Sequence, residues 1–172
     1  MRATAARNVM VAALIIVVVA AIVIGAILAF QPGRFRAAAT REFTIVGGEV
    51  KGQTELLIGG FALLGEEITS PGPTIRVKKG DRVKITFKNV HGYARGLKIA
   101  HNFLVVAEKE GFDPKPLWGA KIGERVYPNE IEAGESGSVT FTPDRAGKFF
   151  YICAVGGHHL YNGMYGSFIV EE

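Results

Sequence analysis

The chain is poor in sulfur and in imidazole, with one cysteine, three methionines and four histidines among 172 residues. A single cysteine excludes a disulfide within the chain. The sequence also lacks a basic run interleaved with aromatic residues, which argues against a nucleic-acid surface. After Phe30 no stretch repeats its apolar residues with a helical period, which argues against a helical bundle. The length is that of about one domain.

Charge is absent from Val9 to Phe30, a run of 22 residues that are mostly Val, Ile, Ala and Leu. About 20 apolar residues cross a bilayer as a helix. We therefore predict a cytoplasmic N-terminus and transmembrane anchor over residues 1–30, followed by a tether over residues 31–40. A cleaved signal peptide is the alternative, with Ala37-Ala38-Ala39 as its candidate site, but the apolar core of a signal peptide usually has only 7–15 residues.

Basic residues flank the apolar run on both sides: Arg2, Arg7, Arg34 and Arg36. The positive-inside rule therefore gives nearly a tie. The free N-terminal amine favours an inside N-terminus, so we expect a single-pass protein of the cell membrane with its domain on the extracytoplasmic face. All 16 acidic residues lie from Glu42 onward, so the pI near 9.3 reflects the flanking arginines.

Short β-like segments, separated by Gly, Pro, Asp and Asn, fill the predicted domain over residues 41–172. Alternation of apolar and polar residues, as in Arg82–Lys88, is typical of a strand with one solvated face. The expected strands include residues 43–46, 74–78, 82–88, 102–106, 137–141, 148–152 and 167–170. This pattern predicts an all-β Greek-key sandwich of seven to eight strands. Residues 107–133 are the least regular part, and we expect a long excursion over the sandwich edge.

The C-terminal segment brings potential metal ligands together in one short loop. Cys153 ends a predicted strand, His158 and His159 follow a Gly-Gly turn, and Met164 precedes the final strand. His101 opens an interior strand about fifty residues upstream. Two His and one Cys with a weak axial Met are the ligands of a blue-copper electron-transfer site. The sequence therefore predicts one type 1 copper ion, with either His158 or His159 as the second imidazole.

Three motifs resemble the cupredoxin family, and within it the membrane-anchored archaeal sulfocyanins. They are His-Asn-Phe-Leu-Val-Val at residues 101–106, the hairpin from Ala-Gly-Glu-Ser-Gly at 133–137 to Gly-Met-Tyr-Gly at 163–166, and Pro-Gly-Pro-Thr-Ile-Arg-Val-Lys-Lys-Gly-Asp at 71–81. The third motif is also similar to the first domain of multicopper oxidases. The resemblance covers roughly Glu42 to Glu172 and implies a cupredoxin-like sandwich.

The resemblance also implies roles for individual residues. The family commonly spaces its loop as Cys-x4-His-x4-Met, but here the spacing from Cys153 leads to His158 and the spacing back from Met164 leads to His159. Because the His-x3-Gly-Met unit is the more constant part, the resemblance favours His101, Cys153, His159 and Met164 as ligands. Asn102 is expected either to tie the two ligand segments together or to be an ordinary strand-start residue. His91, in a turn-like context, is expected on the surface.

A site with four protein ligands has no open position for substrate, whereas a catalytic metal needs one. We therefore expect an electron carrier rather than an enzyme, with an apolar patch near copper formed by Val155, Leu160, Tyr161 and Tyr165. The resemblance implies a membrane quinol-oxidising complex and a terminal oxidase as redox partners. The alternative is a subunit or domain of a copper enzyme, of the nitrite reductase or oxidase type. Such an enzyme would need a second copper centre from a partner, because this chain has no His-x-His pair. Copper storage or delivery would need an exposed, exchangeable site.

Overall fold

The computed structural model describes residues 37–52, 59–94, 97–126, 128–161 and 163–172. The predicted anchor over residues 1–30, and the tether as far as residue 36, lie outside this part of the chain. Within the described residues, no helix is both long and apolar enough to cross a membrane. Residues 38–172 form one compact unit.

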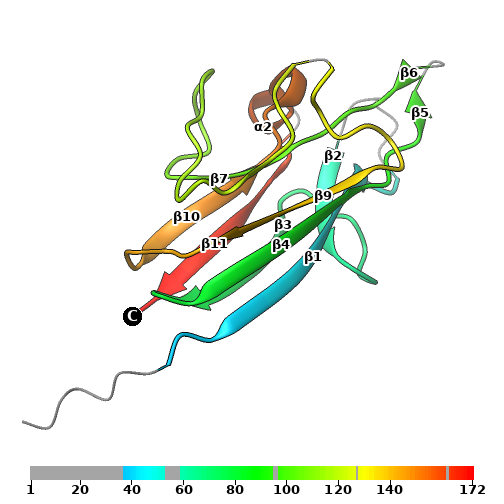
Figure 1. The fold of residues 1–172 in the computed structure, drawn as a ribbon. Coiled ribbons are helices and arrows are strands. Elements are labelled where there is room, and N and C mark those ends of the chain that lie inside the picture. Colours follow the sequence, from blue (N-terminus) through cyan, green and yellow to red (C-terminus); the bar gives the residue numbers. More distant parts are fainter. Residues whose placement is uncertain (1–36, 53–58, 95–96, 127, 162) are drawn as a thin grey trace, which may run out of the picture. The chain divides into compact units, whose positions relative to one another are not determined.

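Two sheets make up this unit (Figure 1). The first sheet has the strand order β2 (Gly59–Leu63), β1 (Thr40–Glu49), β4 (Arg82–Asn89) and β9 (Ser136–Phe141). The second has the order β3 (Gly72–Lys78), β11 (Tyr165–Glu171), β10 (Gly147–Ile152), β7 (Phe103–Val106) and β8 (Lys121–Ile122). Apart from these sheets, β5 (Tyr93–Ala94) pairs antiparallel with β6 (Leu97–Lys98). The predicted all-β sandwich is therefore confirmed, with nine strands in its two sheets instead of seven or eight.

The additional strands have weak sequence signals. β2 begins with two glycines, which are poor strand formers, and its place in the sheet comes from antiparallel pairing with β1. β8 has two residues and lies inside the irregular excursion at 107–133. In contrast, β4 buries every second residue, as its alternating sequence predicts.

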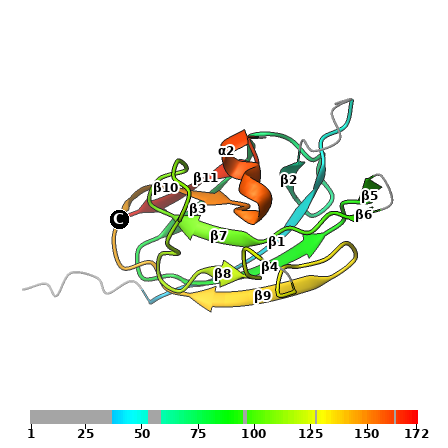
Figure 2. The same cartoon turned by 90° about the horizontal axis from the view of Figure 1, so that it is seen from above.

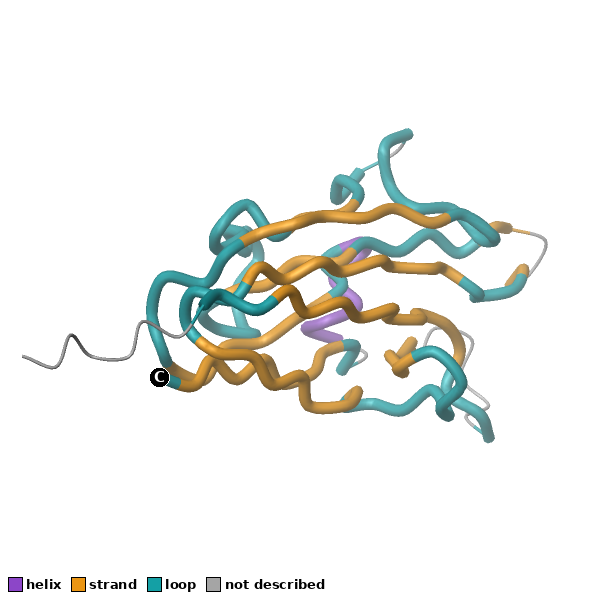
Figure 3. Tube along the Cα trace, turned by 60° about the horizontal axis from the view of Figure 1, so that its bottom comes forward, coloured by secondary structure: helices purple, strands orange, loops and turns teal. Residues whose placement is uncertain are grey.

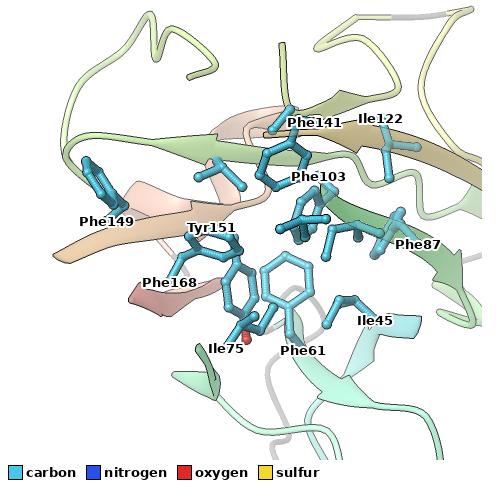
Figure 4. Close-up of a cluster of buried hydrophobic side chains, with 14 of the residues drawn as sticks. Ile45, Phe61, Ile75, Phe87, Phe103, Ile122, Phe141, Phe149, Tyr151 and Phe168 are labelled. Carbon is cyan, nitrogen blue, oxygen red and sulfur yellow. The ribbon is translucent and has the colours of Figure 1, made fainter. Parts of the chain in front are cut away.

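The core between the sheets is rich in aromatic side chains (Figure 4). Phe61 of β2 lies edge-on to Phe87, Phe103 and Tyr151, with ring centroids 6.1, 6.4 and 5.0 Å away. Phe103 stacks on Tyr151 at 5.5 Å. These edge-on and stacked contacts bind the two sheets together directly beneath the ends of β7 and β10.

Helical structure in the described residues is confined to the loop between β10 and β11, where η1 (Val155–Gly157) is followed by α2 (His158–Tyr161) (Figure 3). This loop lies at the end of the sandwich opposite the C-terminus (Figure 1). Seen from above, α2 lies on the side of β7, β10 and β11, away from β9 (Figure 2). The predicted metal-binding loop therefore lies at one end of the sheet that contains β10 and β11.

Gly166 and Tyr151 face each other across β10 and β11, next to this loop. A Cβ on Gly166 would overlap the buried ring of Tyr151, whose hydroxyl donates a 2.6 Å hydrogen bond to the Pro73 carbonyl. We predict that Gly166→Ala lowers the free energy of unfolding by about 1–3 kcal/mol, as overpacking of a tight core does. Chemical denaturation of the copper-free protein measures this. Gly92→Ala is the matched control, because its Cβ would meet no atom within 4 Å; equal stability of the two variants would contradict the prediction.

Candidate metal centre

His101 lies two residues before β7 and is fully buried. Its backbone forms an isolated antiparallel bridge with Ile131, with N–H to carbonyl distances of 3.0 and 2.9 Å in the two directions. The bridge fixes the backbone from which the imidazole projects. The Nδ1 atom of His101 lies 3.4 Å from the sulfur of Cys153.

Cys153 immediately follows β10 and is also fully buried. Strand pairing places it beside His101, because Ile152 of β10 pairs with Leu104 of β7 in antiparallel register. The backbone N–H of Cys153 donates to the Met164 carbonyl at 3.2 Å, which closes the loop at its base. The predicted proximity of Cys153 and His101 is therefore present.

His158 is the second imidazole of the cluster. Its Nδ1 atom lies 3.7 Å from the Cys153 sulfur and 3.2 Å from His101 Nδ1. Gly156 and Gly157 precede it with φ values of 57° and 74°, in the left-handed region that glycine adopts without strain. The expectation that His159 is the ligand concerns a side chain outside the described part of the structure.

Met164, the residue before β11, closes the cluster. It is fully buried, and its backbone N–H donates to the His158 carbonyl at 3.2 Å. A Cβ on Gly59 would lie 2.7 Å from the Met164 sulfur and 3.3 Å from Cε1 of His101. Gly59 therefore leaves the room in which the thioether and the imidazole come together. No sequence pattern predicts this role.

The donor atoms fit a metal ion in their midst. The ligand atoms of His101, Cys153 and His158 all lie within 4.8 Å of one another. Three donors bonded to a metal at about 2.0–2.3 Å in one plane would be roughly 3.6 Å apart. The observed separations of 3.2, 3.4 and 3.7 Å match this arrangement. Two imidazoles and a thiolate with a thioether are the donors of blue copper, so these residues form, with Met164, a type 1 copper site.

Burial sets the protonation of the donors before metal binds. Burial raises the pKa of the Cys153 thiol to about 12, although the backbone N–H groups of Asn102 and Val155 donate to the sulfur and favour the thiolate. Burial, together with the neighbouring His158 and His91, lowers the pKa of His101 to about 2. At neutral pH His101 is therefore already neutral, whereas the thiol must lose a proton to the incoming metal.

Asn102 links the two ligand-bearing segments. Its Oδ1 atom accepts a 2.7 Å hydrogen bond from the backbone N–H of Ala154, and its Nδ2 atom donates to the Glu124 carbonyl at 2.9 Å. The first of these bonds ties the residue after His101 to the residue after Cys153. Of the two expectations for Asn102, the structure confirms the linking role.

The prediction that His91 lies on the surface is wrong. His91 is buried, and its Nδ1 atom lies 2.9 Å from Nε2 of His101. The contact depends on how the chain turns after β4. No local sequence pattern around His91 predicts that turn.

Apolar side chains surround the loop on its outer side. Tyr161 is 71% exposed, whereas Val155 and Tyr165 are only partly buried, and the side chain of Leu160 lies outside the described part. The excursion adds Phe112 and Val126, which are 73% and 70% exposed. A shallow pocket is lined by Phe112, Arg125, Val126, Ala154, Gly156, Gly157 and Tyr161. The apolar patch therefore includes residues of the excursion at 107–133, which were not predicted to belong to it.

Comparisons with known proteins agree with this site. A family model described as multicopper oxidase matches residues 38–172. Similar solved structures are the multicopper oxidase mgLAC, at 29% identity and TM-score 0.53, and a Cu-containing nitrite reductase from Thermus scotoductus SA-01, at 26% and 0.50. Each match covers 77% of this chain but only 39% and 28% of the other.

A multicopper oxidase from Pseudomonas Thermotolerans, at 20% identity and TM-score 0.54 over 79% of this chain and 30% of that one, supports the fold alone. The chain therefore spans less than half the length of these three structures. No curated protein matches the sequence. The fold is that of a cupredoxin.

The two adjacent histidines can be separated by substitution. His158→Ala removes one of the three clustered donors, so we predict that the copper-loaded protein loses its intense thiolate-to-copper absorption band. His159→Ala is the matched control at the next position and is expected to keep the band. Visible absorption after copper addition measures both. A band that survives in His158→Ala and disappears in His159→Ala would instead make His159 the ligand.

Copper loading is expected to release one proton per ion from the Cys153 thiol at pH 8, which is above the usual pKa of histidine. Because the pKa of the thiol is raised to about 12, the apparent affinity should increase about tenfold per pH unit between pH 7 and 9. Calorimetry in buffers of different protonation enthalpy counts the proton. Cys153→Ser should show no such release; an affinity of the native protein that does not change with pH would contradict the raised pKa.

Proposed function

The chain belongs to the multicopper oxidase family, and we propose that it carries single electrons. Its described residues contain one cluster of ligands for a type 1 copper ion. The observation that carries the proposal is the closure of this site. His101, Cys153 and Met164 are fully buried, and His158 is 9% exposed. Catalytic metals keep an open position for water or substrate, whereas four donors buried to this degree favour a closed site that only exchanges electrons.

Electron exchange requires a route to the surface, and the most exposed of the four ligands is His158. The exposed Phe112, Val126 and Tyr161 lie around the loop that bears it, along the same shallow pocket. Small, weak interfaces are typical of electron-transfer encounters. These three side chains suit brief docking of a redox partner close to copper.

The finer proposal concerns location and partners. We propose that the uncharged run from Val9 to Phe30 anchors the carrier in the cell membrane, with the copper domain on the extracytoplasmic face. The sulfocyanin-like motifs support electron transfer from a membrane quinol-oxidising complex to a terminal oxidase. The anchor would confine diffusion to the membrane plane in which such complexes lie.

A second candidate is a subunit of a copper enzyme of the oxidase or nitrite reductase type. It is favoured by the family match and by the larger structures that this chain covers only in part. An enzyme of this kind needs further histidines for another copper centre. The described residues contain no second cluster of three potential metal ligands, so a partner would have to supply that centre.

The copper-loaded full chain in detergent distinguishes the two functions. A carrier is expected to be reduced and reoxidised reversibly by one electron in voltammetry, with no turnover of nitrite or phenols. Sustained nitrite reduction or phenol oxidation by the purified chain would contradict the carrier and favour the enzyme.

The docking surface has its own test. Tyr161→Asp or Val126→Asp should slow electron self-exchange about tenfold or more. The reason is that like charges would then meet when the copper ends of two molecules approach each other. Line broadening in mixtures of oxidised and reduced protein measures the rate. Leu64→Asp is the control, since Leu64 is 62% exposed but follows the end of β2 remote from Gly59. Equal rates in all three variants would exclude this surface.

A further inference from the structure

His91 contacts the side of the His101 ring that faces away from the cysteine. Its Nδ1 atom is 2.9 Å from His101 Nε2, the ring centroids are 5.1 Å apart, and the rings are inclined by 36°. Only 5% of His91 is exposed. A buried polar ring costs free energy unless it is hydrogen-bonded, and this contact provides a partner.

The direction of the hydrogen bond follows from the metal site. Nδ1 of His101 faces the Cys153 sulfur at 3.4 Å and must be unprotonated to bind copper. A neutral imidazole carries one N–H, so the proton of His101 lies on Nε2. His101 Nε2–H is therefore the donor, and His91 Nδ1 is the acceptor.

The backbone of His91 is held in the same frame as that of His101. The His91 N–H donates to Oδ1 of the buried Asn89 at 2.9 Å. Nδ2 of Asn89 donates to the carbonyls of Ile99 and Ile131, each at 2.8 Å. The Ile131 carbonyl also accepts the backbone N–H of His101 at 3.0 Å. Both histidines are thus fixed to Ile131, one directly and the other through Asn89.

We propose that His91 is a positioning residue of the copper site, which acts by accepting the hydrogen bond from His101 Nε2. A partner on the outer nitrogen of a ligating histidine fixes its tautomer and ring orientation and makes it a stronger donor. A stronger nitrogen donor favours Cu(II) over Cu(I), so His91 lowers the reduction potential. The proposal rests on the copper site and does not require that the protein be an electron carrier.

The test compares His91→Leu with His91→Asn in the copper-loaded full chain. Leucine fills the space but accepts no hydrogen bond, whereas the Asn amide oxygen can occupy the position of Nδ1. We expect His91→Leu to weaken copper binding about 10–100-fold and to raise the reduction potential. His91→Asn should restore most of both properties. A purely structural role would lower stability but leave the potential unchanged. Native affinity and potential in His91→Leu would overturn the proposal.

A measurement on the native sequence keeps the proposal testable if neither variant folds. In the ¹⁵N-labelled, copper(I)-loaded full chain, a scalar coupling across the hydrogen bond is expected between His101 Nε2 and His91 Nδ1, with the proton on His101. A proton on His91 Nδ1, or no coupling between the two nitrogens, would overturn it. Failure of the electron-exchange experiments would leave both of these readouts intact, so the two proposals can fail separately.

Discussion

The antiparallel pairing of β7 with β10 is the constraint on which the site depends. The register that sets Ile152 opposite Leu104 places Cys153 and His101 at neighbouring strand ends, with 3.4 Å between sulfur and nitrogen. Successive side chains of a strand point to opposite faces, so a slip of one residue would turn the whole side-chain set of β10 over. The buried aromatic rings beneath these strands resist such a slip, because Tyr151 lies edge-on to Phe61 and stacks on Phe103. Core packing therefore fixes the position of the thiol.

The spacing of the donor atoms bears on electron transfer. Separations of 3.2–3.7 Å match a three-coordinate plane, and Asn102 ties the His101 segment to Ala154. Donors held in this way need to move little when a bound copper ion changes its charge. Burial makes metal binding by the sulfur harder. It raises the pKa of the Cys153 thiol, so the thiol stays protonated until a cation replaces the proton. The site thus combines closely spaced donor atoms with a thiol proton that a metal ion must displace.

Sequence patterns identified the parts of this molecule whose signals are local. The strands with regular alternation, the Cys-to-Met loop and the position of His101 before an apolar strand were predictable. The partner of the outer nitrogen of His101 was not, since His91 reaches it through the turn after β4 and the amide of Asn89. Nor was β2, where Gly59 has value for the space it leaves and not for any strand propensity. A glycine that is needed for the space it leaves produces no periodic pattern in the sequence.

The choice between adjacent histidines depends on a conformation that spacing does not encode. Residues one apart on a helix are turned by about 100° from each other, so at most one of two adjacent imidazoles can face the cysteine from α2. Gly156 and Gly157, at φ of 57° and 74°, set the angle at which α2 begins, and His158 is the one described in the cluster. With His158 as ligand, five residues separate the histidine from Met164. Among them Tyr161 is 71% exposed. This part of the loop therefore adds an exposed aromatic side chain to the apolar surface beside the cluster.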